Sequence, residues 1–359
     1  MKRNSEGKSG TSYKKSSGYK ENYSYKLTEA LIAADIPFEK LNNPILNRFL
    51  QELSKNKTPH PSTLRRCYVP KVHKSIMSLI KKELDNKYLW ISIDETKDIL
   101  KRKAVNNIVG TLQENKQSKH YLLSTKFVPS TNTENMVKSI ETTLEKFWPL
   151  EEISDKILLL VTDRANYMKS TGEKLKEQFP KLIHLTCLAH GLHNISETIR
   201  LTFPLVDKFV LNSKKMLTKS PNRIETFKRL APNLPLPPKP VITRWGTWIS
   251  AAIYFAKNYE SIKPIIQSYD SEKAVCVRRI QKYLSTQNSK LKLDLNYIAD
   301  HFKILKDTIK KLETRNILIS ESVNLIENVH RDLHDLNSDS GKIALERINE
   351  VLSANQNRI

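Results

Sequence analysis

The hydrophobic and polar positions predict a meander of strands in the first half of the chain. The strand candidates are residues 88–96, 104–112 and 120–128, and short links rich in Lys, Asn and Gln separate them. Such links suit antiparallel neighbours. In the first candidate, Leu89 and Ile93 point to one face and Asp94 to the other, because side chains alternate along a strand. The sequence therefore predicts an acidic residue at the end of a half-buried strand.

Helices and strands then alternate. A helical apolar stripe follows the capping-box spacing of Thr131 and Glu134. Residues 155–163 form a nearly unbroken apolar run, which is typical of a central strand covered on both faces. After a polar helix, residues 181–190 predict a fifth strand. The order β-β-β-α-β-α-β-α predicts an α/β fold with an RNase H-like core, in which three antiparallel strands precede parallel strands and helices cover the faces.

Helical patterns flank this core on both sides, and they divide the chain into regions. Composition predicts a disordered basic tail over residues 1–24, which lack an apolar period. Short helices are expected over 25–87, one of them starting at Asn43 and Pro44, an N-cap and a natural first helical residue. The core then spans 88–205. An all-α, insertion-like domain spans 206–359 and contains a rigid proline-rich connector at 231–240.

The last third of the chain keeps apolar residues at a 3-then-4 spacing from Leu295 to Leu333. This spacing favours two helices packed back to back within the domain, with a break near residues 319–322. The alternative is a coiled coil through which the chain forms a homo-oligomer.

The composition of the chain is strongly basic. The chain has 60 Lys and Arg residues against 38 Asp and Glu, a net charge of +22. Such a surplus attracts polyanions and makes their binding sensitive to salt. No apolar run approaches the roughly 20 residues that cross a membrane, and the first residues lack the apolar segment of a secretory signal. We therefore expect DNA, and not a membrane, as the partner. The three cysteines argue for a reducing compartment.

Two aspartates end strands that are neighbours in the expected sheet. Asp94 ends the first strand and Asp163 the fourth, so both lie at the same edge, where ligand sites of open α/β sheets occur. Two carboxylates there could share Mg²⁺ or Mn²⁺ and support two-metal phosphoryl transfer. Alternatively, each aspartate forms a turn or caps a helix. Nothing in the late sequence singles out a third acid among Glu321, Glu327, Glu346 and Glu350.

The segment CLAHGLH supplies Cys187, His190 and His193. A Cys-x-x-His spacing can begin a zinc site, but no fourth ligand at a suitable spacing is visible. A Cys–His nucleophile needs a lowered thiol pKa and a pocket, and the sequence indicates neither. A packed core cysteine is the favoured interpretation.

The segment TRWGTW follows the proline-rich connector and holds Arg244, Trp245 and Trp248. Arginine grips phosphate and tryptophan stacks on unpaired bases, so these residues are candidates for DNA binding. An arginine stacked on tryptophan inside a core is the alternative.

Four motifs, SIDETKD, LLLVTDRANYM, HLTCLAHGLHN and VITRWGTW, occur in this order and closely resemble hAT-type transposases and the genomic proteins derived from them. The N-terminal stretch from ALIAADIPFEKLNNP to STLRRCYVP is similar to the helical part of CGG triplet repeat-binding proteins. Together the resemblance spans roughly residues 26–355. It implies an RNase H-like core interrupted by a helical insertion, with a DDE site that cuts and joins DNA using Mg²⁺ or Mn²⁺.

The resemblance also implies roles for individual residues. Asp94 matches the first acid and metal ligand, and Asp163 the second. Cys187 and His190 match the family's Cys-x-x-His near the active site. The Arg-Trp pair of the family matches Arg244 and Trp245.

Three departures from the family pattern affect the expected function. No cysteine precedes Cys67, so the family's N-terminal BED zinc finger is expected to be missing. The catalytic glutamate, which follows the helical insertion in the family, is not found, and Glu346 stands in the wrong context. The last core helix and the dimerisation segment are also expected to be absent, which leaves a truncated core.

We therefore expect a domesticated or truncated transposase-like protein of the nucleus that binds DNA or chromatin without cutting it. One alternative is a residual DDE-type nuclease or transposase that uses Mg²⁺ or Mn²⁺. Another is a protein-interaction module that dimerises through its C-terminal helices.

Overall fold

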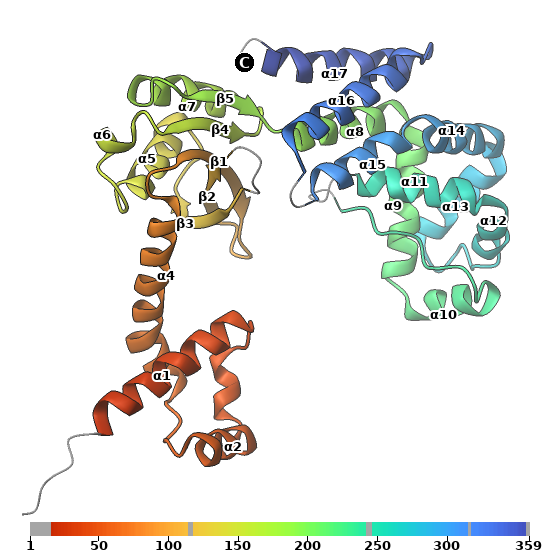
Figure 1. Ribbon diagram of the computed structural model, residues 1–359. Helices are drawn as coiled ribbons and strands as arrows, with labels where there is room; N and C mark the ends of the chain where they lie inside the picture. The colour runs from red at the N-terminus through yellow and green to blue at the C-terminus, as the bar shows by residue number, and fades with distance from the viewer. Residues whose placement is uncertain (1–15, 114–117, 242–245, 315–316, 357–359) are drawn as a thin grey trace, which may run out of the picture. The chain divides into compact units, whose positions relative to one another are not determined.

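The chain divides into two units between Asn86 and Lys87 in the computed structural model (Figure 1). The structure describes residues 16–113, 118–241, 246–314 and 317–356. The first unit is helical, and the second contains the sheet together with the late helices.

The N-terminal unit consists of short helices around a small core. Its elements are α1 (Ser16–Ala33), η1 (Phe38–Asn42), α2 (Pro44–Ser54), α3 (Pro61–Thr63), the π-helical turn η2 (Leu64–Tyr68) and α4 (Val69–Leu84). Helix α2 begins as predicted, because the Asn43 side chain accepts the backbone N–H groups of Ile45 and Leu46. The core consists of Leu31, Leu41 and Leu64.

Two features of this unit differ from what the sequence suggests. Helix α1 begins at Ser16, inside the stretch whose composition indicates disorder. Once the part of α1 around the buried Thr28 is packed, each further turn adds hydrogen bonds at low cost, so the polar turns before it remain helical. On α2, by contrast, Ile45, Phe49 and Leu53 are 56–71% exposed and form an uncovered apolar stripe.

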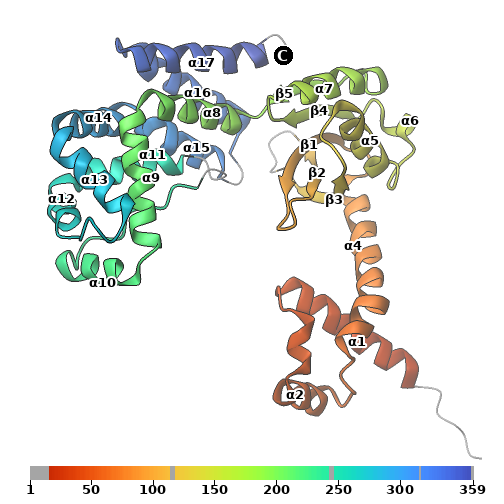
Figure 2. The same cartoon turned by 180° about the vertical axis from the view of Figure 1, so that it is seen from behind.

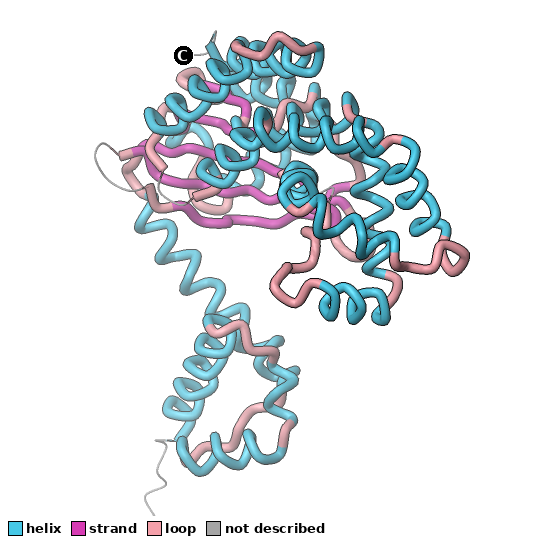
Figure 3. The backbone as a smooth tube through the Cα atoms, turned by 90° about the vertical axis from the view of Figure 1, so that its right-hand side faces the viewer, coloured by secondary structure: helices cyan, strands magenta, loops and turns pink. Residues whose placement is uncertain are grey.

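The sheet confirms the predicted α/β fold with an RNase H-like core. Its strands are β1 (Tyr88–Lys97), β2 (Lys103–Leu112), β3 (His120–Val128), β4 (Ile157–Thr162) and β5 (Ile183–Thr186). They form one layer in the order β3-β2-β1-β4-β5, drawn in magenta in Figure 3. The first three strands are antiparallel, while β4 runs parallel to β1 and β5 parallel to β4. On β1, Leu89, Ile91 and Ile93 are buried, as the alternation predicts.

The helices of the core follow the strands in the predicted order. They are α5 (Thr133–Leu144), α6 (Leu150–Ile153), α7 (Asn166–Gln178) and α8 (Leu188–Thr202). Helix α5 packs against β2, β3 and α7. Its N-cap is Asn132 and not Thr131, because the extended backbone at Asn132 lets its side chain accept the N–H of Asn135 at 2.9 Å.

The remaining helices share one continuous hydrophobic core with α8. They are α9 (Pro204–Thr218), α10 (Pro221–Leu230), α11 (Thr247–Lys257), α12 (Tyr259–Gln267), α13 (Val275–Thr286), α14 (Asn288–His301), α15 (Lys303–Leu312), α16 (Ile319–His334) and α17 (Asp339–Gln356). Among them, no helix of the described residues has the length and apolar character needed to span a bilayer.

Most of the late apolar stripe is buried within the chain. At most 2% of each side chain is exposed for Leu295, Ile298, Phe302, Leu305, Ile309, Ile326 and Leu333. This burial confirms that the stripe packs within the domain, but it lies on the three helices α14, α15 and α16 and not on the predicted two. The break lies earlier than predicted, between the end of α15 at Leu312 and the start of α16 at Ile319, and a second interruption separates α14 from α15 at Phe302.

Helix α17 lies beside β5, at one edge of the sheet. The sequence predicted that the last helix of the core is absent. Helix α17 packs along α8 and contacts β5 (Figures 1 and 2). At Gly191 of α8 the two helices approach so closely that an added Cβ would lie 2.8 Å from Cγ1 of Val351. The Asn355 side chain accepts the Thr186 backbone N–H at 2.8 Å and donates to the Thr186 carbonyl at 3.3 Å. Helix α17 therefore supplies hydrogen-bond partners for the backbone N–H and carbonyl of one residue of the edge strand β5.

Candidate functional site

The two predicted aspartates meet at one edge of the sheet. Ser92 of β1 pairs with Val161 of the parallel neighbour β4, and Asp94 and Asp163 each stand two residues beyond this pair. The two aspartates thus lie at the same edge of the sheet, as predicted. Asp163 directly follows β4, but Asp94 does not end its strand, because β1 continues to Lys97 through its pairing with β2. A compact group of acidic, imidazole and thiol side chains forms around them.

Asp94 is half-exposed at the rim of this edge. Its Oδ1 lies 3.9 Å from Nε2 of His190. Burial raises the pKa of Asp94, the nearby His190 opposes that shift, and the charge of Asp163 adds to it; the net direction is upward. The carboxylate of Asp94 is thus less acidic than a free aspartate and sits among charged neighbours.

Asp163 combines a structural contact with its place in the acid pair. Its Oδ1 accepts the backbone N–H of Ala165 at 3.1 Å, immediately before α7. This turn-forming role is the alternative that the sequence left open, and it is present. Nearby, the Tyr167 hydroxyl donates to Oε2 of Glu95 at 3.3 Å. Burial, with the charges of Asp163 and Glu95, raises the pKa of Tyr167 to about 12, so this phenol stays protonated.

Cys187 and His190 form a hydrogen-bonded pair beside the acids. The predicted fifth strand ends earlier than expected, at Thr186, so Cys187 is the N-cap of α8 and His190 lies in its first turn. The Cys187 N–H donates to the Thr162 carbonyl at 2.7 Å, which ties this turn to β4. Burial works against the charged form of both side chains. Their mutual hydrogen bond and the attraction between their charges oppose burial, together with backbone N–H groups at Cys187 and the carboxylates of Asp94 and Asp163 at His190. The net result is that the pKa of Cys187 is lowered and the pKa of His190 is raised.

The side chains at this edge were also considered as possible ligands of a metal ion. Across residues 16–113, 118–241, 246–314 and 317–356, no group of three or more His, Cys, Asp or Glu side chains is arranged to hold a metal ion. His193, considered with Cys187 and His190 for zinc, is half-buried, and burial lowers its pKa. Asp94 and Asp163 are oxygen donors that could hold a divalent cation here, with water or phosphate oxygens in its other positions.

A groove of about 620 Å³ leads away from Asp163 along α8 and α17. The face of α8 that lines it presents His190, Asn194 and Thr198, one residue every turn. The opposite wall is formed by Arg347 and Glu350 of α17. The acid edge therefore opens into a polar channel between the core and the last helix.

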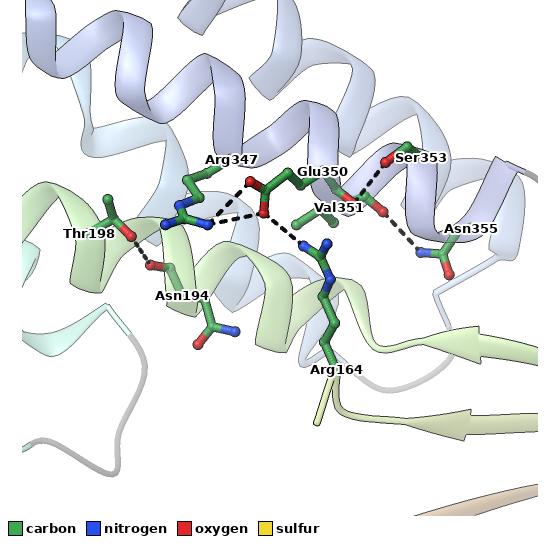
Figure 4. Close-up of polar contacts among 8 residues, drawn as sticks. All are labelled: Arg164, Asn194, Thr198, Arg347, Glu350, Val351, Ser353 and Asn355. Carbon is green, nitrogen blue, oxygen red and sulfur yellow. Dashed lines mark hydrogen bonds and ion pairs between the residues drawn. The ribbon is translucent and has the colours of Figure 1, made fainter. Parts of the chain in front are cut away.

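The sequence argument missed the groove residues Arg164 and Arg347, and it named Glu350 only as one of four late acids. Glu350 accepts from Arg164 at 3.1 Å and from Arg347 at 3.1 and 3.2 Å, as Figure 4 shows. Arg164 directly follows Asp163 and could have been noted as a charge beside the acid. Glu350 could not be singled out, because its place depends on the packing of α17. Glu346, one turn earlier, is exposed.

The predicted DNA-binding segment is only partly described. Arg244 and Trp245 lie outside the described residues. Trp248 is 6% exposed and belongs to the hydrophobic core of the late helices. Its burial agrees with the core position in the alternative, because α11 turns the ring inward, where no base can stack on it.

Comparison with known families gives a match for the part of the chain that contains the sheet. Residues 59–216 match the model of a domain of unknown function, DUF659, which includes all five strands, Asp94, Asp163, Cys187 and His190. This family is associated with hAT-like transposase-related proteins. This stretch is therefore similar to DUF659, and in the structure it contains the sheet of the RNase H-like core. No curated protein matches the chain.

Proposed function

We propose that this chain is a domesticated transposase-related protein of the nucleus that binds DNA or chromatin without cutting it. The positive charge carries the proposal. The chain has a net charge of +22, and residues 1–86 hold 17 Lys and Arg against 8 Asp and Glu. A charge of this size and sign favours binding to a polyanion. The likeness of the N-terminal region to CGG triplet repeat-binding proteins supports the same proposal.

The contacts of the acidic residues support binding without cutting. Asp163 accepts a backbone N–H, and Glu350 accepts from Arg164 and Arg347. Asp94 lies beside His190. Asp163 and Glu350 are thus engaged by hydrogen-bond donors of the chain itself, which compete with a cation for their oxygens.

A titration of DNA binding against salt tests the proposal. Fluorescence anisotropy of a labelled duplex and of a labelled single strand would be measured with the full chain. Affinity is expected to fall by orders of magnitude between about 50 and 200 mM salt, because phosphate contacts release counterions. Absence of binding at the lowest salt, from protein shown to be folded by circular dichroism, would overturn the proposal.

The second candidate is a residual nuclease. The specific observation in its favour is that Asp94 and Asp163 each lie two residues beyond the paired residues Ser92 and Val161. In addition, Asp163 and Glu350 line one groove. Nicking of supercoiled plasmid with Mn²⁺ separates the two candidates. The variants are Asp94→Ala and Asp163→Ala, and the control is Asp155→Ala, which removes an aspartate from the opposite end of β4.

The expected result is that no form of the protein nicks the plasmid. Nicking by the wild type and by Asp155→Ala, lost in both edge variants, would show a working metal site and refute the non-cutting proposal.

Self-association remains a subordinate proposal. Most of the late apolar stripe is buried, but Leu318, Ile319 and Val323 at the start of α16 are exposed. Sedimentation velocity of the wild type and of Ile319→Lys would reveal a dimer that depends on this end of the helix.

A further inference from the structure

The cluster of Arg164, Glu350 and Arg347 joins two elements far apart in the sequence. Arg164 comes from the loop between β4 and α7, and the other two side chains come from α17. Nη1 of Arg164 lies 3.1 Å from Oε2 of Glu350, and Nη1 of Arg347 lies 3.1 Å from the same oxygen (Figure 4). Two guanidinium groups therefore converge on one carboxylate oxygen inside the groove.

This cluster is not what holds α17 in place. Its three side chains are 43–52% exposed, and ion pairs at such sites contribute little to stability because water screens them. Ala344 and Ile348 anchor the helix in the hydrophobic core of the late helices, and Val351 holds it close to Gly191 of α8. The arginines can therefore exchange their partner without releasing α17.

The positions of the two arginines suit a phosphate group. Guanidinium groups bind carboxylate and phosphate in the same forked manner, so a phosphate can take the place of Glu350. The groove adds Asn194 and Thr198, whose side chains are of the kind that contact phosphate and sugar in DNA complexes. It ends at Asp163 and His190, beside the acid pair.

We propose that Arg164 and Arg347 form a binding site for a backbone phosphate of DNA, which Glu350 occupies when no DNA is bound. This inference rests on the proposed DNA-binding function and locates one contact of that function. Glu350 acts as an internal competitor: DNA must displace its carboxylate before a phosphate can reach both guanidinium groups. The groove then guides the strand from the acid edge along α8.

Removal of the competitor is the first test. The full chain and its Glu350→Gln variant would be titrated with a labelled oligonucleotide, together with Glu346→Gln, which removes an exposed carboxylate one turn away on the same helix. A general charge effect strengthens binding equally in both variants. The proposal expects Glu350→Gln to bind at least about threefold more tightly than Glu346→Gln, because only this change frees two arginines.

Removal of a phosphate contact is the second test. Arg347→Gln is compared with Lys342→Gln, which removes an exposed positive charge from the same helix. Loss of a true phosphate contact lowers the slope of log affinity against log salt by about one, and the distant lysine is expected to change it less. Thermal unfolding would confirm that all variants are folded.

The outcomes separate this inference from the proposed function. Binding by the wild type with equal effects in each matched pair overturns the phosphate site and leaves DNA binding intact. Binding by Glu350→Gln alone supports the site, with the competitor dominant in the wild type. No binding by any form overturns both.

Discussion

Helix α2 and the late helices carry apolar residues at the same helical spacing but differ in what covers them. In the late helices most of the stripe from Leu295 to Leu333 is buried, and only its part at the start of α16 is exposed. On α2, Ile45, Phe49 and Leu53 remain 56–71% exposed. Spacing therefore determines which side of a helix is apolar, while the number of neighbouring elements determines whether that side is buried.

The reason lies in the size of each unit. Helices α8 to α17 share one core, so every helix finds neighbours on its apolar side. The N-terminal unit has a core of three buried leucines, to which the inner side of α2 contributes the partly buried Leu50. A small unit buries a smaller fraction of its surface, and the outer side of α2 has no element left to cover it within the described residues.

The largest effect is expected where the stripe is fully packed. Phe302 is buried between α14 and α15, and Phe302→Ala should lower the free energy of unfolding by about 3–5 kcal/mol, because it leaves a cavity. Urea unfolding followed by circular dichroism measures this loss. Ile319→Ala, at an exposed position of the same stripe, is the control and should change little. A loss below about 1 kcal/mol for Phe302→Ala would mean that these helices are loosely packed.

A smaller effect is expected at the start of α2. Asn43 accepts two backbone N–H groups, and Asn43→Ala should cost about 1 kcal/mol because these donors lose their partner. Hydrogen exchange at Ile45 and Leu46 would report the loss locally. The neighbouring exposed Asn42, changed to alanine, serves as the comparison. Equal exchange in both variants would show that the cap does not stabilise α2.

The smallest effect is expected on the exposed stripe itself. Phe49→Ser should change the free energy of unfolding by less than about 0.5 kcal/mol, since the ring contributes little burial. Leu50→Ser, on the inner side of the same helix, should be clearly more destabilising. If Phe49→Ser proved as costly as Leu50→Ser in urea unfolding, the outer side of α2 would have to be covered in solution.

The sequence predicted those parts of the fold that depend on local patterns. Alternation on β1 placed Asp94 opposite the buried face, and the order of strands brought Asp94 and Asp163 to one edge. The pattern did not predict α17 at the sheet, because Thr186 and Asn355 meet across 169 residues. The partnership of Arg164 with Glu350 spans 186 residues and likewise follows only from tertiary packing. The sequence argument assigned Trp248 to DNA binding, whereas its ring lies in the hydrophobic core. The pattern could not decide between the two, because an apolar aromatic suits a core and a stacking site equally well.

The contact between Asn355 and β5 has a consequence for synthesis of the protein. An uncovered edge strand offers its backbone groups to any other extended chain. At about 5–20 residues per second, the ribosome completes α17 on the order of ten seconds after β5 has emerged. During that interval Thr186 lacks the amide that later satisfies its N–H and its carbonyl. The nascent chain is therefore most open to mispairing before its final helix is made.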